Sequence, residues 1–166
     1  MHSTPQPPIR VAVIDDAPEV RSALHGLLNS TPDTLCTGTY AGIIPALTGL
    51  LENPADIVLV DLRMPEIDGG TGIPMLRGLF PNTQFLVLTM FHEDDDIFRA
   101  LSNGANGYLL KSDPPDALLT ALRDVSAGGA PMSPAIARRV VQTFQKPLQN
   151  PADPVLTQRE LAVLTL

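Results

Sequence analysis

The chain has 166 residues, of which 44% are hydrophobic and 17% are charged, and its formal net charge is −7 at pH 7. This composition is typical of a globular protein and excludes a disordered chain, and no apolar stretch approaches the roughly 20 residues that cross a bilayer. The acidic balance argues against binding nucleic acid through a broad basic face. The single cysteine, Cys36, cannot form an internal disulfide, which favours a cytoplasmic protein. Because no apolar stretch is long enough to cross a bilayer, we expect no membrane partner.

Residues 1–8 are polar and proline-rich and are predicted to form a disordered tail. Beyond them, short apolar runs alternate with amphipathic segments of helical period. The runs predict strands at residues 10–15, 34–39, 57–61, 84–89 and 107–110. Such runs are typical of a parallel sheet that is covered by helices on both faces. The predicted fold is therefore α/β, a flavodoxin-like doubly wound five-stranded parallel sheet of order 2-1-3-4-5, followed by a C-terminal linker helix.

Prolines mark the predicted starts of three helices. First helical positions are predicted at Pro18, Pro114 and Pro134, which follow the candidate caps Ala17, Asp113 and Ser133. The fifth helix of the sheet domain is expected at about 114–127.

The third and fourth helices give weaker signals. The third is predicted to begin late, near Thr71, or to be distorted, because two glycines and Pro74 fall in its first two turns. A proline inside a helix costs about 3 kcal/mol. The acidic run from Glu93 to Asp96 is predicted to cap the fourth helix and to be solvated.

The pattern changes after residue 128. Residues 134–145 predict an amphipathic helix, and residues 146–155 contain three prolines and predict a flexible linker. Leu156 to Leu161 has the spacing of a capping box with a hydrophobic staple, which predicts a further helix start. The predicted organisation is therefore a tail at 1–8, a main domain at 9–128, a linker region at 129–155 and the beginning of a second domain at 156–166.

Polar side chains end four of the predicted strands. Asp15 and Asp16 end the first strand and Asp61 the third, while Thr89 and Lys111 end the fourth and fifth. The carboxyl ends of parallel strands meet at one edge of the sheet, where open α/β sheets bind ligands. Carboxylates 4 Å apart repel by about 4 kcal/mol at an effective dielectric of 20, and Mg²⁺ prefers such hard oxygen ligands. The pattern predicts metal-assisted phosphoryl chemistry on an aspartate.

These positions, with the sequence DLRMP at residues 61–65, resemble the receiver domain of two-component response regulators. The sequences LTMF at 88–91 and GANGYLLK at 104–111 narrow the resemblance to the NarL/FixJ type, over about residues 9–128. The final 11 residues resemble the opening of a LuxR-type helix-turn-helix domain. The resemblance implies that the chain is a fragment of a longer regulator and that this fragment contains no DNA-binding residues.

The resemblance also implies roles for the residues at the sheet edge. Asp61 would be the nucleophile that accepts a phosphoryl group from a sensor histidine kinase, with Lys111 and Mg²⁺ neutralising charge on the transferred group. Asp16 and Asp61 would bind Mg²⁺ directly, Asp15 through water, and the Arg63 backbone carbonyl would be a further ligand.

The family pattern assigns a switch to two further positions. Thr89 would move to bond the phosphoryl group, and the ring of Tyr108 would turn inward to fill the vacated space. Arg63 and Phe91 lie where the side chain influences water access to the acyl phosphate. Because both side chains are bulky, we expect slow hydrolysis.

The resulting hypothesis is a signalling protein and not an enzyme. It would form a homodimer on activation and contact DNA only through the absent C-terminal domain. One alternative is a pseudo-receiver that acts through protein–protein contact without phosphorylation. Another is an aspartate-nucleophile phosphatase of the haloacid dehalogenase type, which requires an aspartate two residues after the nucleophile, where this chain has Arg63.

Overall fold

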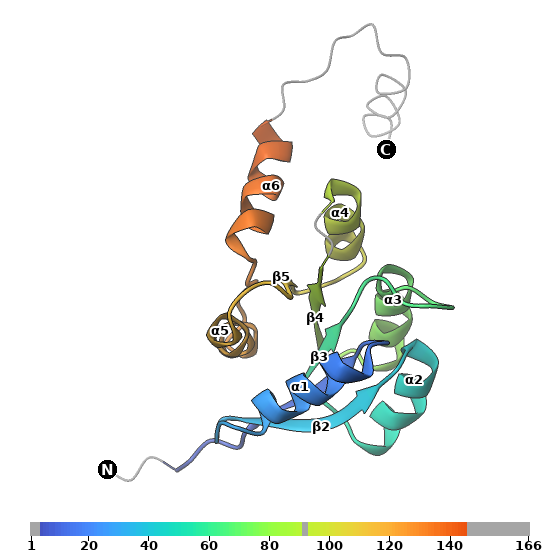
Figure 1. The fold of residues 1–166 in the computed structure, drawn as a ribbon, viewed down its shortest axis with the longest axis vertical. Coiled ribbons are helices and arrows are strands. Elements are labelled where there is room, and N and C mark those ends of the chain that lie inside the picture. The colour runs from blue at the N-terminus through green and yellow to red at the C-terminus, as the bar shows by residue number, and fades with distance from the viewer. Residues whose placement is uncertain (1–3, 91–92, 146–166) are drawn as a thin grey trace, which may run out of the picture.

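The computed structural model describes residues 4–90 and 93–145, so the predictions for Phe91 and for residues 146–166 lie outside the described residues. The strands are β1 (Ile9–Ile14), β2 (Thr34–Tyr40), β3 (Ile57–Val60), β4 (Gln84–Thr89) and β5 (Gly107–Leu110). The helices are α1 (Pro18–Leu28), α2 (Ile43–Glu52), α3 (Gly69–Leu79), α4 (Asp94–Ser102), α5 (Pro115–Ser126) and α6 (Pro134–Gln145). The strands form one parallel sheet of order β2-β1-β3-β4-β5, which confirms the predicted fold and the C-terminal helix (Figure 1).

The sheet is covered on both faces, as its uniformly apolar strands require. Side chains of α1 and α5 pack on one face, and side chains of α2, α3, α4 and α6 pack on the other. The central strand β3 is buried along its whole length. The two layers of helices leave the carboxyl ends of the strands together at one edge.

None of the helices within residues 4–90 and 93–145 has the length and apolarity needed to cross a membrane.

The late start predicted near Thr71 was wrong, because α3 begins at Gly69. Asp68 is its N-cap, and the Asp68 carboxylate accepts a hydrogen bond of 2.7 Å from the backbone N–H of Thr71. This cap satisfies one of the free N–H groups of the first turn. The cap therefore allows the helix to begin at the glycines, and the late start was predicted without taking this cap into account.

Pro74 lies inside α3 and cannot donate the hydrogen bond that would normally reach the carbonyl of Gly70. The side-chain amide of Asn103, which caps the C-terminus of α4, donates to that carbonyl at 2.8 Å. A group from a neighbouring helix thus takes the place of the missing backbone donor. This side-chain hydrogen bond explains how α3 accommodates a proline in its interior.

The contact between Asn103 and Gly70 gives a first testable expectation. Asn103→Ala is expected to destabilise the protein by about 1–2 kcal/mol, because it leaves the Gly70 carbonyl without its side-chain donor. In a Pro74→Ala background the new backbone N–H can bond that carbonyl, so the same change is expected to cost less than about 0.5 kcal/mol. Urea unfolding of the four variants measures this coupling, and equal costs in both backgrounds would contradict the account.

Two of the predicted caps use their side chains elsewhere. Helix α5 begins at Pro115 with Pro114 as its N-cap, so the prediction of Pro114 as first helical residue after an Asp113 cap was one residue early. The carboxylate of Asp113 instead accepts hydrogen bonds from the Leu110 backbone N–H and from the hydroxyl of Ser133. Ser133 precedes α6 as predicted, but its hydroxyl oxygen accepts from the Leu110 N–H at 3.0 Å. Both side chains therefore stabilise the end of β5.

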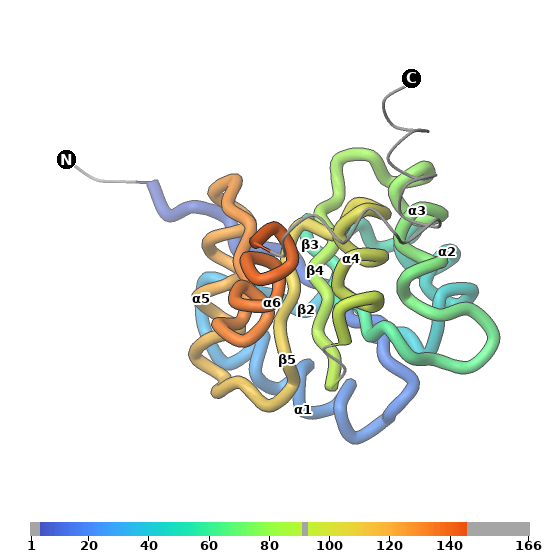
Figure 2. Tube along the Cα trace, turned by 90° about the horizontal axis from the view of Figure 1, so that it is seen from above, coloured from blue at the N-terminus to red at the C-terminus, as the bar shows by residue number. Residues whose placement is uncertain are grey.

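The segment before α6 runs along the outer side of β5. The N–H of Tyr108 donates to the carbonyl of Pro131, and the N–H of Ser133 donates to the carbonyl of Tyr108, each at 3.0 Å. Helix α6 then rises beside α4, with Ile136 fully buried and Arg139 paired with Asp94 at 3.0 Å (Figure 1). Seen from above, α6 covers the region over β5 (Figure 2).

Candidate functional site

The acidic residues lie at the carboxyl ends of the neighbouring strands β1 and β3. Ile14 pairs with Val60 in the sheet, so the next residues, Asp15 and Asp61, emerge side by side. The Asp61 N–H donates to the Ile14 carbonyl at 3.0 Å. One carboxylate oxygen from each of Asp15, Asp16 and Asp61 lies within 4.8 Å of the others. The structure thus brings together the three carboxylates that the sequence had placed at this edge.

Lys111 joins this cluster from the end of β5. Its ammonium nitrogen lies 2.6 Å from Asp15 Oδ2 and 2.8 Å from Asp61 Oδ2. The backbone N–H of Lys111 donates to the backbone carbonyl of Thr89 at 2.9 Å, which ties the lysine to the end of β4. Burial opposes the charge of the ammonium, but hydrogen bonds to Asp15 and Asp61 outweigh it and raise the pKa of Lys111. The lysine is therefore held protonated between two buried carboxylates.

One lysine does not neutralise three carboxylates. Burial raises the pKa of Asp15 even though Lys111 and the Ala17 N–H bond its carboxylate. Among the described residues, the buried Asp61 Oδ1 finds no hydrogen-bond partner. A buried oxygen of this kind calls for a cation or another donor. The donor set of hard carboxylate oxygens, with Asp16 exposed to water, fits Mg²⁺.

The two predicted switch residues are both fully buried. Thr89 is the last residue of β4, and its side chain lies in the interior. Tyr108 of β5 belongs to the same apolar cluster as Ile97 of α4 and Ile136 of α6. Burial, followed by the charge of Asp96, raises the pKa of Tyr108, so its hydroxyl remains neutral. The packing of Tyr108 links β5 to two helices, while its role as a switch remains a prediction.

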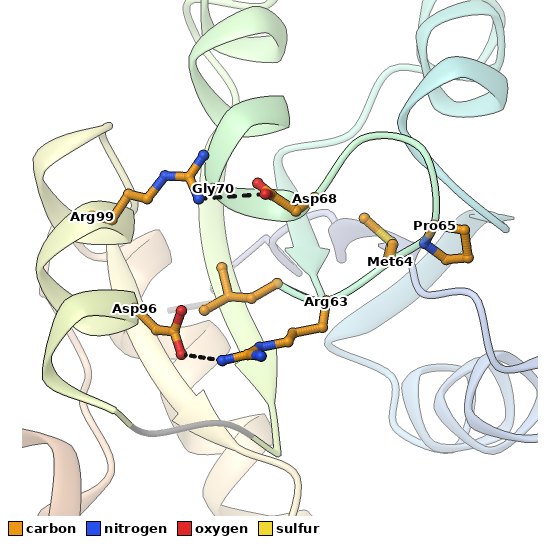
Figure 3. A pocket seen from close by; sticks show the side chains of 8 residues that line it. Arg63, Met64, Pro65, Asp68, Gly70, Asp96 and Arg99 are labelled. Carbon is orange, nitrogen blue, oxygen red and sulfur yellow. Dashed lines mark hydrogen bonds and ion pairs between the residues drawn. The ribbon is translucent and has the colours of Figure 1, made fainter.

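Arg63 lies in the loop between β3 and α3, two residues after Asp61. Its guanidinium pairs with the Asp96 carboxylate of α4 at 2.9 Å. This pair lies at one side of a pocket of about 520 Å³ between the loop and α4 (Figure 3). The carboxylate of Asp94 pairs with Arg139. The acidic run lies at the start of α4 as predicted, and cationic partners distant in sequence also pair with two of its members.

Two residues to which the sequence pattern assigned no role support the acidic cluster. The guanidinium of Arg21, in α1, donates to the Asp15 backbone carbonyl at 2.7 Å. Gly69 donates its N–H to the Leu62 carbonyl at 2.8 Å, and a Cβ on Gly69 would collide with the carbonyl oxygen of Asp61 and lie 3.0 Å from Leu62 Cα. The glycine that follows the Asp68 cap was the only sequence signal for this close approach.

Comparisons with known proteins agree with this arrangement. Residues 11–123 match the response regulator receiver domain family. The chain is 32% identical over 165 residues to the oxygen regulatory protein NreC of Staphylococcus aureus (strain bovine RF122 / ET3-1), covering 95% of this chain and 76% of that protein. It resembles a LuxR-family two-component response regulator from Aurantimonas sp. SI85-9A1 with a TM-score of 0.79 and 28% identity, over 84% of this chain and 99% of that one. The signal receiver domain of a NarL response regulator from Mycobacterium tuberculosis gives a TM-score of 0.70 and 28% identity, over 74% and 99% of the two chains.

Proposed function

The chain belongs to the response regulator receiver domain family, and from this premise we propose that it accepts a phosphoryl group on Asp61 from a sensor histidine kinase. The observation that carries the proposal is the Asp61 carboxylate itself. One of its oxygens is buried without a partner among the described residues, and the other lies 2.8 Å from the Lys111 ammonium. A carboxylate in this position has an available nucleophilic oxygen beside a fixed positive charge.

In the proposed reaction an oxygen of Asp61 attacks the phosphorus of a phosphohistidine. An O–P bond to Asp61 forms while the P–N bond to the histidine breaks, and the electron pair of that bond returns to the imidazole ring. The ammonium of Lys111 neutralises charge on the transferred group, and Asp15 keeps the ammonium at the site. Bound Mg²⁺ would neutralise further charge, held by Asp16 and Asp61 directly, by Asp15 through water and by the Arg63 backbone carbonyl.

The proposed output is a change in conformation and in dimerisation that controls a DNA-binding domain. Thr89 would bond the phosphoryl group and Tyr108 would follow it, shifting a pre-existing equilibrium between two states. The apolar cluster that Tyr108 shares with Ile97 of α4 and Ile136 of α6 supports this route, since a change at the tyrosine would act on both helices. The bulk of Arg63 supports slow hydrolysis of the acyl phosphate. In this proposal the chain acts as a switch for an output and not as an enzyme.

The experiment that tests the proposal is intact-mass analysis after incubation with a small acyl phosphate donor, with and without Mg²⁺. A single phosphoryl adduct is expected on the wild type in the presence of Mg²⁺ and on Asp61→Asn in neither condition. Asp56→Asn is the matched control, because Asp56 is a carboxylate exposed at the other end of β3 and paired with Arg10, and it is expected to behave as the wild type does.

Absence of an adduct on the wild type would overturn the proposal and favour a receiver that acts without phosphorylation. Release of inorganic phosphate from a phosphomonoester in large excess over the protein would instead favour the phosphatase alternative.

A further inference from the structure

The end of β5 is held from outside the sheet by the segment that precedes α6. Residues 131–133 pass along the outer edge of β5 on the way from α5 to α6 (Figure 1). We propose that the Ser133 hydroxyl is a positioning residue for phosphorylation of Asp61, because it fixes the strand end from which Lys111 reaches the acidic cluster. This inference rests on the proposed function. It extends the site beyond residues 11–123, the part of the chain that matches the receiver domain family.

The backbone N–H of Leu110 is the group that needs a partner at this edge. Leu110 is the last residue of β5, and among the described strands β5 pairs only with β4. An edge strand leaves every second N–H without a partner in the sheet. The Tyr108 N–H finds the carbonyl of Pro131, and the Leu110 N–H finds the hydroxyl oxygen of Ser133, each at 3.0 Å. The Ser133 side chain therefore continues the strand-like pairing by one further hydrogen bond.

Asp113 connects this hydrogen bond to the turn that carries Lys111. The Asp113 N–H donates to the Leu110 carbonyl at 3.1 Å, which closes a turn over residues 110–113. The Asp113 carboxylate accepts hydrogen bonds from the Ser133 hydroxyl and, at 3.3 Å, from the Leu110 N–H. Ser133 is 3% exposed, so water hardly competes for its hydroxyl. The turn is thus closed by its own backbone and held from outside by the Ser133 side chain.

The backbone of Ser133 is itself part of a packed element. Its carbonyl accepts hydrogen bonds from the N–H groups of Ile136 and Ala137, each at 2.9 Å, and so begins the hydrogen-bonding pattern of α6. Ile136 is fully buried in the apolar cluster that α6 shares with the sheet. The hydroxyl is therefore presented to the turn from the fixed start of a helix. A group that positions another is most precise when it lies on such a rigid element.

Lys111 has little freedom to absorb a movement of this turn. Its side chain is 17% exposed, and its ammonium nitrogen lies 2.6 Å from Asp15 Oδ2 and 2.8 Å from Asp61 Oδ2. A misplacement of about 1 Å in a reacting site can lower a rate by about 100-fold. Ser133→Ala removes one of the two acceptors of the Leu110 N–H and leaves the other. We therefore expect a partial misplacement of the lysine and a phosphorylation rate about 5- to 20-fold lower.

The test compares the rates of phosphoryl adduct formation in Ser133→Ala and in the wild type, by intact mass, at fixed concentrations of Mg²⁺ and acetyl phosphate. Thr34→Val is the matched control. The Thr34 hydroxyl is also buried and donates to the Leu28 carbonyl at 2.6 Å, but it lies on β2, at the opposite edge of the sheet. Urea unfolding measures the stability that each change removes. We expect Thr34→Val to be phosphorylated at the wild-type rate.

Two further variants separate positioning of Lys111 from a general loss of stability. Ser133→Thr keeps the hydroxyl and is expected to recover most of the rate that Ser133→Ala loses. Asp113→Ala removes the other acceptor of the Leu110 N–H and is expected to slow phosphorylation as well. Because Asp113 is only half-buried, this variant also provides the measurement if Ser133→Ala does not fold.

Three results would overturn the inference: a wild-type rate in Ser133→Ala, equal slowing in Thr34→Val, or no recovery in Ser133→Thr. Each is measured against a wild type that takes up phosphate, so the proposed function would stand. Failure of the wild type to form an adduct would instead remove the proposed function.

Discussion

Replacement of Lys111 with alanine is expected to destabilise the Mg²⁺-free protein by about 3–5 kcal/mol and to slow phosphorylation of Asp61 by about 100-fold or more. The ammonium lies between two buried carboxylates, of which Asp15 is 3% and Asp61 is 8% exposed in the side chain. Removing the cation leaves both charges buried without an ionic partner. In the proposed reaction the same cation also neutralises the transferred phosphoryl group, so stability and reactivity are expected to fall together.

Urea unfolding and the rate of adduct formation measure these two effects. Arg123→Ala is the control for the loss of a cation, because Arg123 pairs with Asp33 at 2.6 Å but both side chains are more than 40% exposed. An exposed pair contributes about 1 kcal/mol or less. Addition of Mg²⁺ is expected to restore part of the stability lost by Lys111→Ala, since a bound cation stabilises the native state by mass action. Equal losses of stability in Lys111→Ala and Arg123→Ala would show that the buried carboxylates do not depend on Lys111 for charge neutralisation.

Replacement of Gly69 with alanine is expected to destabilise the protein by about 2–3 kcal/mol and to impair phosphorylation. The added methyl group would press on the backbone carbonyl of Asp61, a rigid group that cannot rotate away as a side chain would. Overpacking of this kind typically costs 1–3 kcal/mol. Because the displaced atoms belong to Asp61 and Leu62, the carboxylate is expected to move away from Lys111, and adduct formation reports that movement.

The same helix provides the control. Gly78 lies in the last turn of α3, and a Cβ at this position would have no atom within 4 Å other than its own helix and chain neighbours. Gly78→Ala is therefore expected to stabilise the protein by about 0.5–1 kcal/mol through helix propensity alone. If Gly78→Ala destabilised the protein as much as Gly69→Ala, α3 would be intolerant of added methyl groups in general. The effect at Gly69 would then not be due to its close approach to the Asp61 carbonyl.

The sequence predicted the strands well because buried parallel strands have an unambiguous apolar signal. Each predicted range agrees with the observed strand to within one residue. The acidic cluster could be predicted for the same reason, since the ends of β1 and β3 determine where Asp15 and Asp61 emerge. Local pattern and tertiary structure point to the same arrangement at these residues.

The remaining features depend on contacts between distant residues. Pro74 argued against a regular α3, and only the position of Asn103 on another helix explains why the proline is accommodated. Ser133 has the composition of a cap, yet its hydroxyl is committed to the end of β5. The acidic run of α4 carried no sign that Arg63 would reach it. Such pairings are set by how helices pack on the sheet, which a single sequence does not specify.

The strand-like pairing of Pro131 and Ser133 with Tyr108 has a consequence for the angle of α6. An α-helix turns by about 100° for each residue. Because the pairing fixes Ser133, the residue that precedes α6, against the sheet, it also fixes the rotational phase at which Ile136 and Arg139 meet α4. Insertion or deletion of one residue between Ser133 and Ile136 would turn that face away. The short segment before α6 therefore does more than connect two elements, because its pairing with β5 sets the orientation of α6 relative to the sheet.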